Sequence, residues 1–216
     1  MKDTDIAKEA DRYYTEKFKE FEEGPLAADW NSVEAQQIRF AQLSKLLPQD
    51  KTQEFSLCDF GSGLGDYHTY LSKDYPYLSY TGIDVSHEII ERARQIRKDG
   101  GEYICDSTIT LQYDYIVASG IFNVCQEIQK DDWMKYILST ISLFSEHAEK
   151  GFAFNCLTKY SDPDRMQDYL YYADPLFLFD HCKKNVSRNV ALLHDYDIYD
   201  FTIIVRNDGT WGAVRS

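Results

Sequence analysis

The sequence predicts an α/β fold in which a doubly wound, mostly parallel seven-stranded sheet ends in an antiparallel hairpin and carries an N-terminal helical cap. Three observations predict it. Short apolar runs alternate with helix-like runs over 53–157, a glycine-rich turn follows the first apolar run, and two nearby apolar runs lie close to the end of the chain. The 216 residues suit one such domain, so we expect a single domain over 1–216.

The first 50 residues are predicted to form the helical cap. Up to about Gly24, apolar and aromatic side chains recur at helical spacing among many charges. A second helix is expected to begin after Ser32, whose hydroxyl suits an N-cap, and to end before Pro48. Residues 29–32 interrupt the two helices, and we expect them to close over the site as a lid.

The predicted core spans 53–157 and alternates strands with helices. The apolar runs that predict strands are 55–60, 80–85, 103–105, 113–118 and 151–157. Helices are expected after the glycine turn, at about 66–73, after the N-cap Ser86, and from Trp133 to Phe144. This βα alternation indicates a Rossmann-like parallel sheet with helices on both faces.

The rest of the chain breaks the alternation. Residues 158–188 form a tyrosine-rich insertion, which includes a helix expected to begin at Asp174-Pro175 and to end near Asn185. The apolar runs 190–193 and 201–205, within 189–206, then predict the terminal hairpin.

Composition narrows the function classes. With 36 acidic and 23 basic residues the net charge is −13, which repels phosphate backbones and argues against a nucleic-acid partner. The five cysteines are scattered without a Cys-x-x-Cys pair, so we expect neither a metal site nor disulfides. The charged N-terminus lacks a signal sequence, and no apolar run is long enough to span a bilayer, so we expect a soluble, cytoplasmic protein.

The stretch Leu57-Cys-Asp-Phe-Gly-Ser-Gly-Leu-Gly65 carries most of the functional information. Glycines are needed where the backbone adopts positive φ angles or approaches a ligand closely, and a strand-to-helix turn aims amide groups at that ligand. The turn therefore predicts a floor for a nucleoside-like cofactor. On the glycines alone, an ordinary glycine-rich loop explains the stretch equally well.

The spacing of the turn argues against phosphate-containing cofactors. A dinucleotide turn has the pattern G-x-G-x-x-G, whereas this chain has Asp66 at the position of the last glycine, where a carboxylate would repel a pyrophosphate. No Gly-Lys-Ser/Thr follows, which excludes a P-loop. Asp59, just before the glycines, can accept hydrogen bonds from an ammonium group. These features favour a cationic cofactor without phosphates.

Asp59-Phe-Gly-Ser-Gly-Leu-Gly65, followed by Asp84 at the end of the second strand, resembles the class I S-adenosylmethionine-dependent methyltransferases. The resemblance implies S-adenosylmethionine as the cofactor, with the glycine turn at its amino acid part, Asp84 on the ribose hydroxyls and Asp106 near the adenine amine. It covers 53–157 closely and the rest in architecture. The cofactor-binding residues that we predict are Asp59, Gly61, Ser62, Gly63, Gly65, Asp84, Val85, Asp106, Ser107 and Ser119.

Each acid also has a structural interpretation. Asp59 can bond to nearby amides, Asp84 can cap the following helix, and Asp106 can be a turn residue. If Asp84 contacts only the ribose, Asp84→Ala is expected to lower cofactor affinity without unfolding the protein.

The implied activity is methyl transfer by in-line displacement to a small-molecule or saccharide acceptor. An activated methyl group needs little beyond alignment of the nucleophile and exclusion of water. A base would help an oxygen acceptor, and the candidates His68, His181 and His194 are all better explained structurally, so the catalytic residue stays unassigned.

Acceptor binding is expected from the cap, the insertion and the end of the fourth strand. The residues predicted to bind substrate are Tyr14, Trp30, Asn31, Asn123 and Tyr171. For most of the aromatic residues packing is the simpler explanation, and Asn123 can equally be a turn or capping residue. The chain is expected to be a monomer or homodimer. The alternatives are an NAD-dependent oxidoreductase and a non-catalytic methyltransferase-like binding protein.

Overall fold

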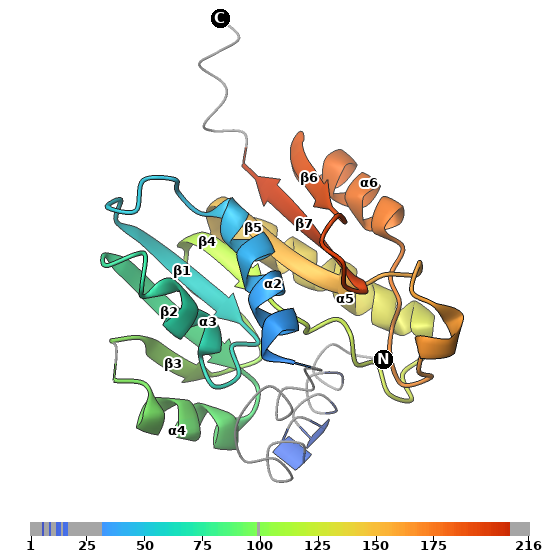
Figure 1. The fold of residues 1–216 in the computed structure, drawn as a ribbon, viewed down its shortest axis with the longest axis horizontal. Helices are drawn as coiled ribbons and strands as arrows, with labels where there is room; N and C mark the ends of the chain where they lie inside the picture. Colours follow the sequence, from blue (N-terminus) through green and yellow to red (C-terminus); the bar gives the residue numbers. More distant parts are fainter. Residues whose placement is uncertain are drawn as a thin grey trace, which may run out of the picture.

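Seven strands form one sheet in the order β3-β2-β1-β4-β5-β7-β6 (Figure 1). This computed structural model describes residues 6, 9, 12, 13, 15, 16, 32–98 and 100–207. The strands are β1 (Phe55–Phe60), β2 (Leu78–Asp84), β3 (Glu102–Cys105), β4 (Tyr113–Ala118), β5 (Ala148–Leu157), β6 (Asn189–Leu193) and β7 (Asp200–Arg206). The pairs from β3 to β5 are parallel, and β7 is antiparallel to both β5 and β6. The predicted doubly wound sheet with a terminal hairpin is confirmed.

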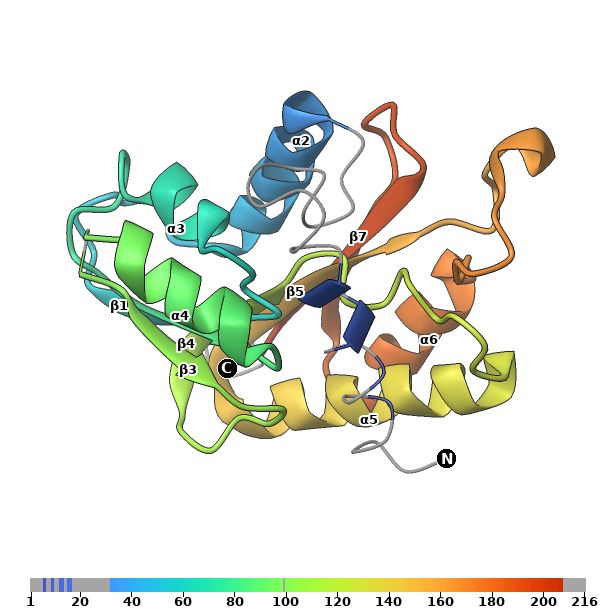
Figure 2. The ribbon, with the colours of Figure 1, turned by 90° about the horizontal axis from the view of Figure 1, so that it is seen from below.

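Helices cover both faces of the sheet, as the βα alternation requires (Figure 2). One face carries α2 (Val33–Leu43), α3 (Asp66–Leu71) and α4 (His87–Ile96), and the other carries α5 (Lys130–His147) and α6 (Pro175–Asn185). Each layer buries its own apolar cluster. The cluster under α5 and α6 is the larger and also contains Ile6. No helix in the described part of the chain is long and apolar enough to cross a bilayer.

Side-chain caps start three helices where the sequence predicts them. The Ser32 hydroxyl accepts a hydrogen bond from the Ala35 amide at 3.1 Å, and Ser86 caps α4 in the same way. Asp174 accepts the amides of Leu176 and Phe177 at the start of α6. Such caps satisfy amides that lack partners within the helix, which explains why these boundaries were readable from sequence.

Several boundaries differ from the prediction by a few residues, and two of these differences have a visible cause. Helix α2 ends at Leu43 and tightens into the 3-10 helix η2 (Ser44–Leu46) before Pro48. Strand β5 begins at Ala148, directly after α5, rather than at Gly151. The added residues join the start of β5 to the start of β4, because Lys150 forms a 2.6 Å ion pair with Asp114 on β4. Charged residues at a strand end conceal its start from a search for apolar runs.

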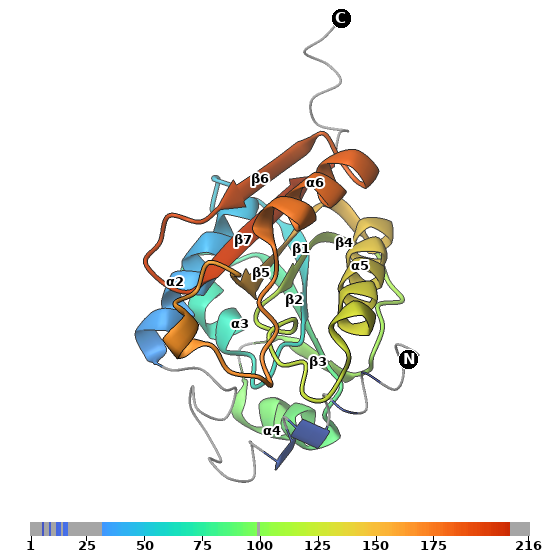
Figure 3. The ribbon, with the colours of Figure 1, turned by 90° about the vertical axis from the view of Figure 1, so that its right-hand side faces the viewer.

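The first half of the insertion, residues 158–173, forms a strap along the carboxyl ends of the strands (Figure 3). The strap contains the short 3-10 helix η3 (Pro163–Arg165). Backbone hydrogen bonds connect the strap to its neighbours. The amides of Cys125 and Gln126 both donate to the Tyr169 carbonyl at 3.0 Å, and the Tyr171 amide donates to the Asn123 carbonyl at 2.8 Å. The strap is therefore fastened to the loop that follows β4.

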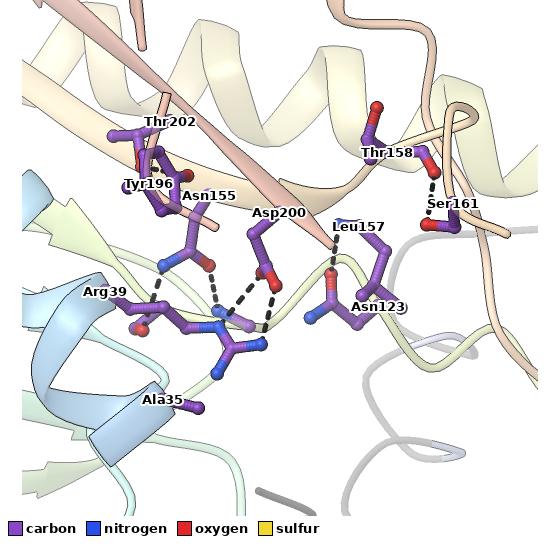
Figure 4. Close-up of polar contacts among 12 residues, drawn as sticks. Ala35, Arg39, Asn123, Asn155, Leu157, Thr158, Ser161, Tyr196, Asp200 and Thr202 are labelled. Carbon is purple, nitrogen blue, oxygen red and sulfur yellow. Dashed lines mark hydrogen bonds and ion pairs between the residues drawn. The ribbon is translucent and has the colours of Figure 1, made fainter. Parts of the chain in front are cut away.

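A buried ion pair docks helix α2 onto the sheet. Arg39 of α2 donates through Nε and Nη2 to the two carboxylate oxygens of Asp200, at 3.0 and 2.5 Å (Figure 4). The Asp200 side chain is fully buried and that of Arg39 is 8% exposed. Because β7 is antiparallel, its first residue lies at the same edge of the sheet as the last residues of β5. The pair therefore fastens α2 at the carboxyl edge.

We expect Asp200→Asn to lower the free energy of unfolding by about 3 kcal/mol, because the change leaves the Arg39 guanidinium buried without a counter-charge. Urea denaturation measures this. Adding Arg39→Met should recover part of the loss. The control Asp180→Asn, which breaks an exposed ion pair with Lys184 on α6, should cost less than about 1 kcal/mol. Equal losses from the two single variants would contradict a stabilising role for the buried pair.

Candidate functional site

The carboxyl ends of β1, β2, β3 and β4 meet at one edge of the sheet. Strand β1 lies between β2 and β4. The chain passes from β1 to β2 and β3 on one side, and then crosses to β4 on the other side of β1. Crevices at such a switch of strand order are where open α/β sheets bind ligands. The predicted site residues that follow these strands are therefore brought to a common edge.

The glycine turn takes the left-handed backbone path that its sequence predicts. Gly61, Gly63 and Gly65 have φ angles of 78°, 54° and 76°. The amides of Gly61 and Ser62 both donate to the Ile83 carbonyl, at 2.7 and 3.0 Å, and the Gly65 amide donates to the Ser62 carbonyl at 3.0 Å. The turn is thus hydrogen-bonded to the end of β2 and leads directly into α3.

The glycines differ in what surrounds them. A Cβ on Gly61 would lie 2.2 Å from Ile121 Cγ2, and one on Gly65 would lie 2.3 Å from Tyr103 Oη. A Cβ on Gly63 would meet no atom of the described residues within 4 Å. Gly61 and Gly65 are therefore required by packing, whereas none of the described residues fills the space in front of Gly63. That space is available to a ligand.

Asp84 ties the turn to the start of α4. Its two carboxylate oxygens accept hydrogen bonds from the Gly63 amide at 2.9 Å and from the Ser86 amide at 3.0 Å. The assumption behind the expected effect of Asp84→Ala, that only ribose contacts would be lost, is therefore wrong, because the carboxylate also holds the backbone. A carboxylate offers about four acceptor sites on its two oxygens, so holding these two amides is compatible with binding a diol.

Asp59 lies buried beneath the turn. It is 3% exposed and accepts a 2.6 Å hydrogen bond from the hydroxyl of Tyr80 on β2. Burial raises the pKa of the Asp59 carboxyl to about 7; the Tyr80 hydrogen bond opposes this rise, and the charges of Asp84 and Asp66 add to it. The acid is therefore a titrating group near neutral pH inside the core.

We expect the stability difference between Asp59→Asn and the wild type to depend on pH. The folded pKa lies above the unfolded value near 3.8, so wild-type stability falls as the pH rises from 4 to about 7. The amide does not ionise and can still accept the Tyr80 hydroxyl. Urea denaturation at pH 5 and pH 8 should show the variant gaining about 2 kcal/mol relative to the wild type over this interval.

The matched control for this measurement is Asp114→Asn. Pairing with Lys150 and hydrogen bonds from Ser56 outweigh burial, and they lower the pKa of Asp114. Its stabilising contribution is therefore complete above pH 5, and its variant should differ from the wild type by the same amount at both pH values. A pH-independent difference for Asp59→Asn as well would contradict an ionising Asp59.

The other predicted cofactor residues around β2 and β3 occupy different surroundings. Asp106 is exposed just after β3, and its Oδ1 accepts the amides of Ser107 and Thr108 at 2.7 and 3.1 Å, as a turn residue would. Val85 is half-buried beyond β2, and its carbonyl faces the thiol of Cys105. The Ser62 hydroxyl is buried and has no hydrogen-bond partner among the described residues.

That hydroxyl packs against β2. A Cβ on Gly82 would lie 2.7 Å from Ser62 Oγ, so the serine side chain fills the space above this glycine. Ser62 therefore joins the turn to the sheet through its side chain and through its amide. Cofactor contact by Ser62 stays a prediction.

On the other side of the turn, Asn155 orients the end of β4. This fully buried residue of β5 accepts the Gly120 amide at 2.8 Å and donates to the Ser119 hydroxyl at 3.2 Å (Figure 4). Asn155 was not among the residues predicted from the sequence. The signal was present, because one amide side chain stands within the apolar run Phe152-Ala-Phe-Asn-Cys-Leu157. A buried polar group in such a run needs specific partners.

The predicted substrate residues are only partly covered by the structure. Tyr14, Trp30 and Asn31 lie outside the described residues. The Asn123 side chain accepts the Leu157 amide at 3.0 Å (Figure 4), and Tyr171 is buried in the larger core cluster. Both residues thus have structural partners, which agrees with the capping and packing interpretations. Substrate contact by either stays a prediction.

The three candidate histidines are far from equivalent. His68 is 4% exposed, stacks on Tyr80 with ring centroids 4.3 Å apart, and lies 3.3 Å from the hydroxyl of Tyr103. His181 contacts Asn185 within α6. These contacts favour the structural interpretation of both residues. His194 is exposed just after β6, at the carboxyl edge, where its ring lies 6.0 Å from that of Tyr160.

Asp66 has cationic and amide partners. It forms an ion pair with Arg97, and Gln36 of α2 donates to its other oxygen at 3.3 Å. The expected repulsion of a pyrophosphate by Asp66 is therefore weakened, because Arg97 offsets the charge. The glycine spacing remains as the argument against a dinucleotide. Within the described ranges, no group of three or more histidine, cysteine or acidic side chains is placed to hold a metal ion.

Comparison with known proteins supplies a relative. The chain is 47% identical over 155 residues to "Putative methyltransferase Rv1506c" of Mycobacterium tuberculosis (strain ATCC 25618 / H37Rv), a match that covers 70% of this chain and 93% of the relative. This chain belongs to the same methyltransferase family as that relative. No protein-family model matches the sequence.

Solved structures of low sequence identity share the fold. The plantazolicin methyltransferase BpumL in complex with SAH has a TM-score of 0.61 and 15% identity over 80% of this chain and 84% of its own. The DhpI-SAM-HEP complex also has a TM-score of 0.61 and 15% identity, over 92% and 96%. The methyltransferase fold thus extends over most of the chain.

Proposed function

We propose that this methyltransferase binds S-adenosylmethionine at the glycine turn and transfers its methyl group to a small-molecule acceptor. The open space at Gly63 carries this proposal. It lies between tightly packed glycines and beside the carboxylate at the tip of β2. The family relationship supports the same choice of cofactor, and the neighbour structures bound to SAH and SAM agree with it.

The donors and acceptors along this edge suit the cofactor. Asp84 places a carboxylate, the acceptor type that suits ribose hydroxyls, at the tip of β2, and exposed Asp106 lies at the tip of the next strand, where an adenine amine would reach. Asp59 beneath the turn adds negative charge when ionised, which favours an ammonium group. Gly63 permits close approach of the backbone. These acceptors fit a cationic nucleoside.

The protein contributes to the transfer mainly by positioning the cofactor and the acceptor. S-adenosylmethionine supplies a methyl group already activated by its sulfonium. Ser119 and Gly120, oriented by Asn155, form the wall next to the turn on the acceptor side. The strap covers the same edge and is fastened to Asn123 and to Cys125, so it excludes water from that side. Alignment and desolvation of this kind are sufficient for in-line transfer to a nucleophile of adequate reactivity.

The acceptor side lies between β4, β5, β7 and α2. The Arg39–Asp200 pair and Asn155 lie buried beneath it and carry no net charge, and His194 with Tyr160 borders it at the end of β6. A neutral, polar small molecule suits such surroundings. Of the three histidines, His194 is the one whose exposure leaves it accessible to an acceptor proton, and a saccharide acceptor stays within this class.

Calorimetry with S-adenosylhomocysteine tests the cofactor site. The wild type should bind it, and Gly63→Ala should weaken binding by about tenfold or more, because its methyl group enters the open space. The same variant should lose only about 1 kcal/mol of stability, the cost of a left-handed alanine. If the wild type does not bind S-adenosylhomocysteine, the proposal is wrong. If Gly63→Ala binds it as tightly as the wild type does, this space is not the site.

A matched variant distinguishes the effect of the available space from the strain of a left-handed alanine. Gly65→Ala has the same left-handed strain, but its Cβ would overlap the buried Tyr103 hydroxyl, so it should lower the unfolding midpoint far more than Gly63→Ala does. Thermal unfolding monitored by circular dichroism distinguishes the two.

Replacing Asp84 should affect both ligand and turn. We expect Asp84→Asn to lower affinity for S-adenosylhomocysteine by about tenfold and to cost about 1–2 kcal/mol of stability, because its amide nitrogen cannot accept the second backbone hydrogen bond. The measurements are calorimetry and urea denaturation. Loss of stability with unchanged affinity would assign Asp84 to the backbone alone.

A further inference from the structure

We propose that Arg97 is a positioning residue that holds the glycine turn in its cofactor-binding shape. Arg97 follows the last residue of α4, and its three guanidinium nitrogens all bond to the turn and α3. Nε donates to the Leu64 carbonyl at 2.6 Å, Nη1 to the Thr69 hydroxyl at 2.7 Å, and Nη2 to the Asp66 carboxylate. The side chain is 16% exposed, so these bonds are partly shielded from water.

The first of these bonds acts on the turn itself. Leu64 lies between Gly63 and Gly65, and the peptide group that joins Leu64 to Gly65 is held at both ends: its carbonyl accepts from Arg97, and its amide donates to the Ser62 carbonyl. A peptide that is followed by glycine rotates more freely, because glycine has no Cβ to restrict its φ angle. Arg97 removes that freedom at the position next to the open space.

Residues that flank the two ends of α4 both bind the glycine turn. Asp84, three residues before His87 at the start of α4, holds the Gly63 amide, and Arg97, just past Ile96, holds the Leu64 carbonyl. Helices α3 and α4 lie side by side on the same face of the sheet (Figure 1). Both contacts approach the turn from β2 and α4, and the space in front of Gly63 stays open.

The charge of Arg97 has a second effect. It neutralises Asp66 at the first position of α3, which otherwise adds to the negative charge near Asp59 and Asp84. A guanidinium suits this task because its fixed fork can serve three acceptors at once, whereas a lysine ammonium is a single point of charge. A turn held in its bound shape before the ligand arrives loses less conformational entropy on binding.

This inference rests on the proposed function, since the turn is taken to hold the amino acid part of the cofactor. It therefore predicts a selective loss of affinity. Two probes separate the contribution of the amino acid part from that of the nucleoside. S-adenosylhomocysteine contains the amino acid, whereas 5′-methylthioadenosine has only a methyl group on the sulfur in its place. Arg97→Gln should weaken the first about tenfold and the second less than about twofold in calorimetry. A purely structural role would weaken both alike.

Two further variants complete the test. Arg94→Gln is the matched control, because Arg94 lies on the same helix but donates to the Tyr103 carbonyl and Glu91 rather than to the turn. It should leave both affinities unchanged. Arg97→Lys keeps the charge beside Asp66, and it should fold like the wild type, as circular dichroism would verify, and lose affinity for S-adenosylhomocysteine only partly.

The outcomes separate the two proposals. Failure of the wild type to bind either probe would overturn the proposed function itself. A wild type that binds both, together with Arg97 variants that weaken the two probes equally or neither of them, would overturn the positioning role and leave the proposed function standing.

Discussion

The hydrogen bond from the Gly63 amide to the Asp84 carboxylate is the contact on which the architecture of the site depends. It joins the turn after β1 to the tip of β2, and the same carboxylate holds the Ser86 amide at the start of α4. A charge-assisted bond of this kind fixes the path of a flexible turn more firmly than a neutral one. Because the neighbouring strands are parallel, the ends of β3 and β4 lie at the same edge of the sheet as this contact.

The elements were readable from sequence because their signals are local. Ser32, Ser86 and Asp174 precede helical runs, and Gly61, Gly63 and Gly65 mark a turn that only glycine adopts easily. The position of Asp84 after the second strand was predicted for the same reason. Its bonds to two backbone amides were not, because a single acid gives no indication of how many donors converge on it.

The contacts that escaped prediction join distant parts of the chain. Arg39 and Asp200 are 161 positions apart, Asn155 and Gly120 are 35 apart, and Arg97 and Leu64 are 33 apart. Nothing in the neighbouring residues of either partner specifies the other. The burial of Asp59 is of the same kind, since it depends on Tyr80 and on the helices packed above both. Such pairings follow from topology, which the pattern of apolar residues gives only in outline.

The Arg39–Asp200 pair has a consequence for how this enzyme can be divided. It connects a helix near one end of the chain to a strand near the other, and each partner is buried by the fold that the other completes. A fragment that ends before β7 leaves a guanidinium in the interior, and one that begins after α2 leaves a carboxylate there. Shortened versions for crystallisation, or chimaeras that exchange the cap with a relative, should therefore carry α2 and the terminal hairpin together.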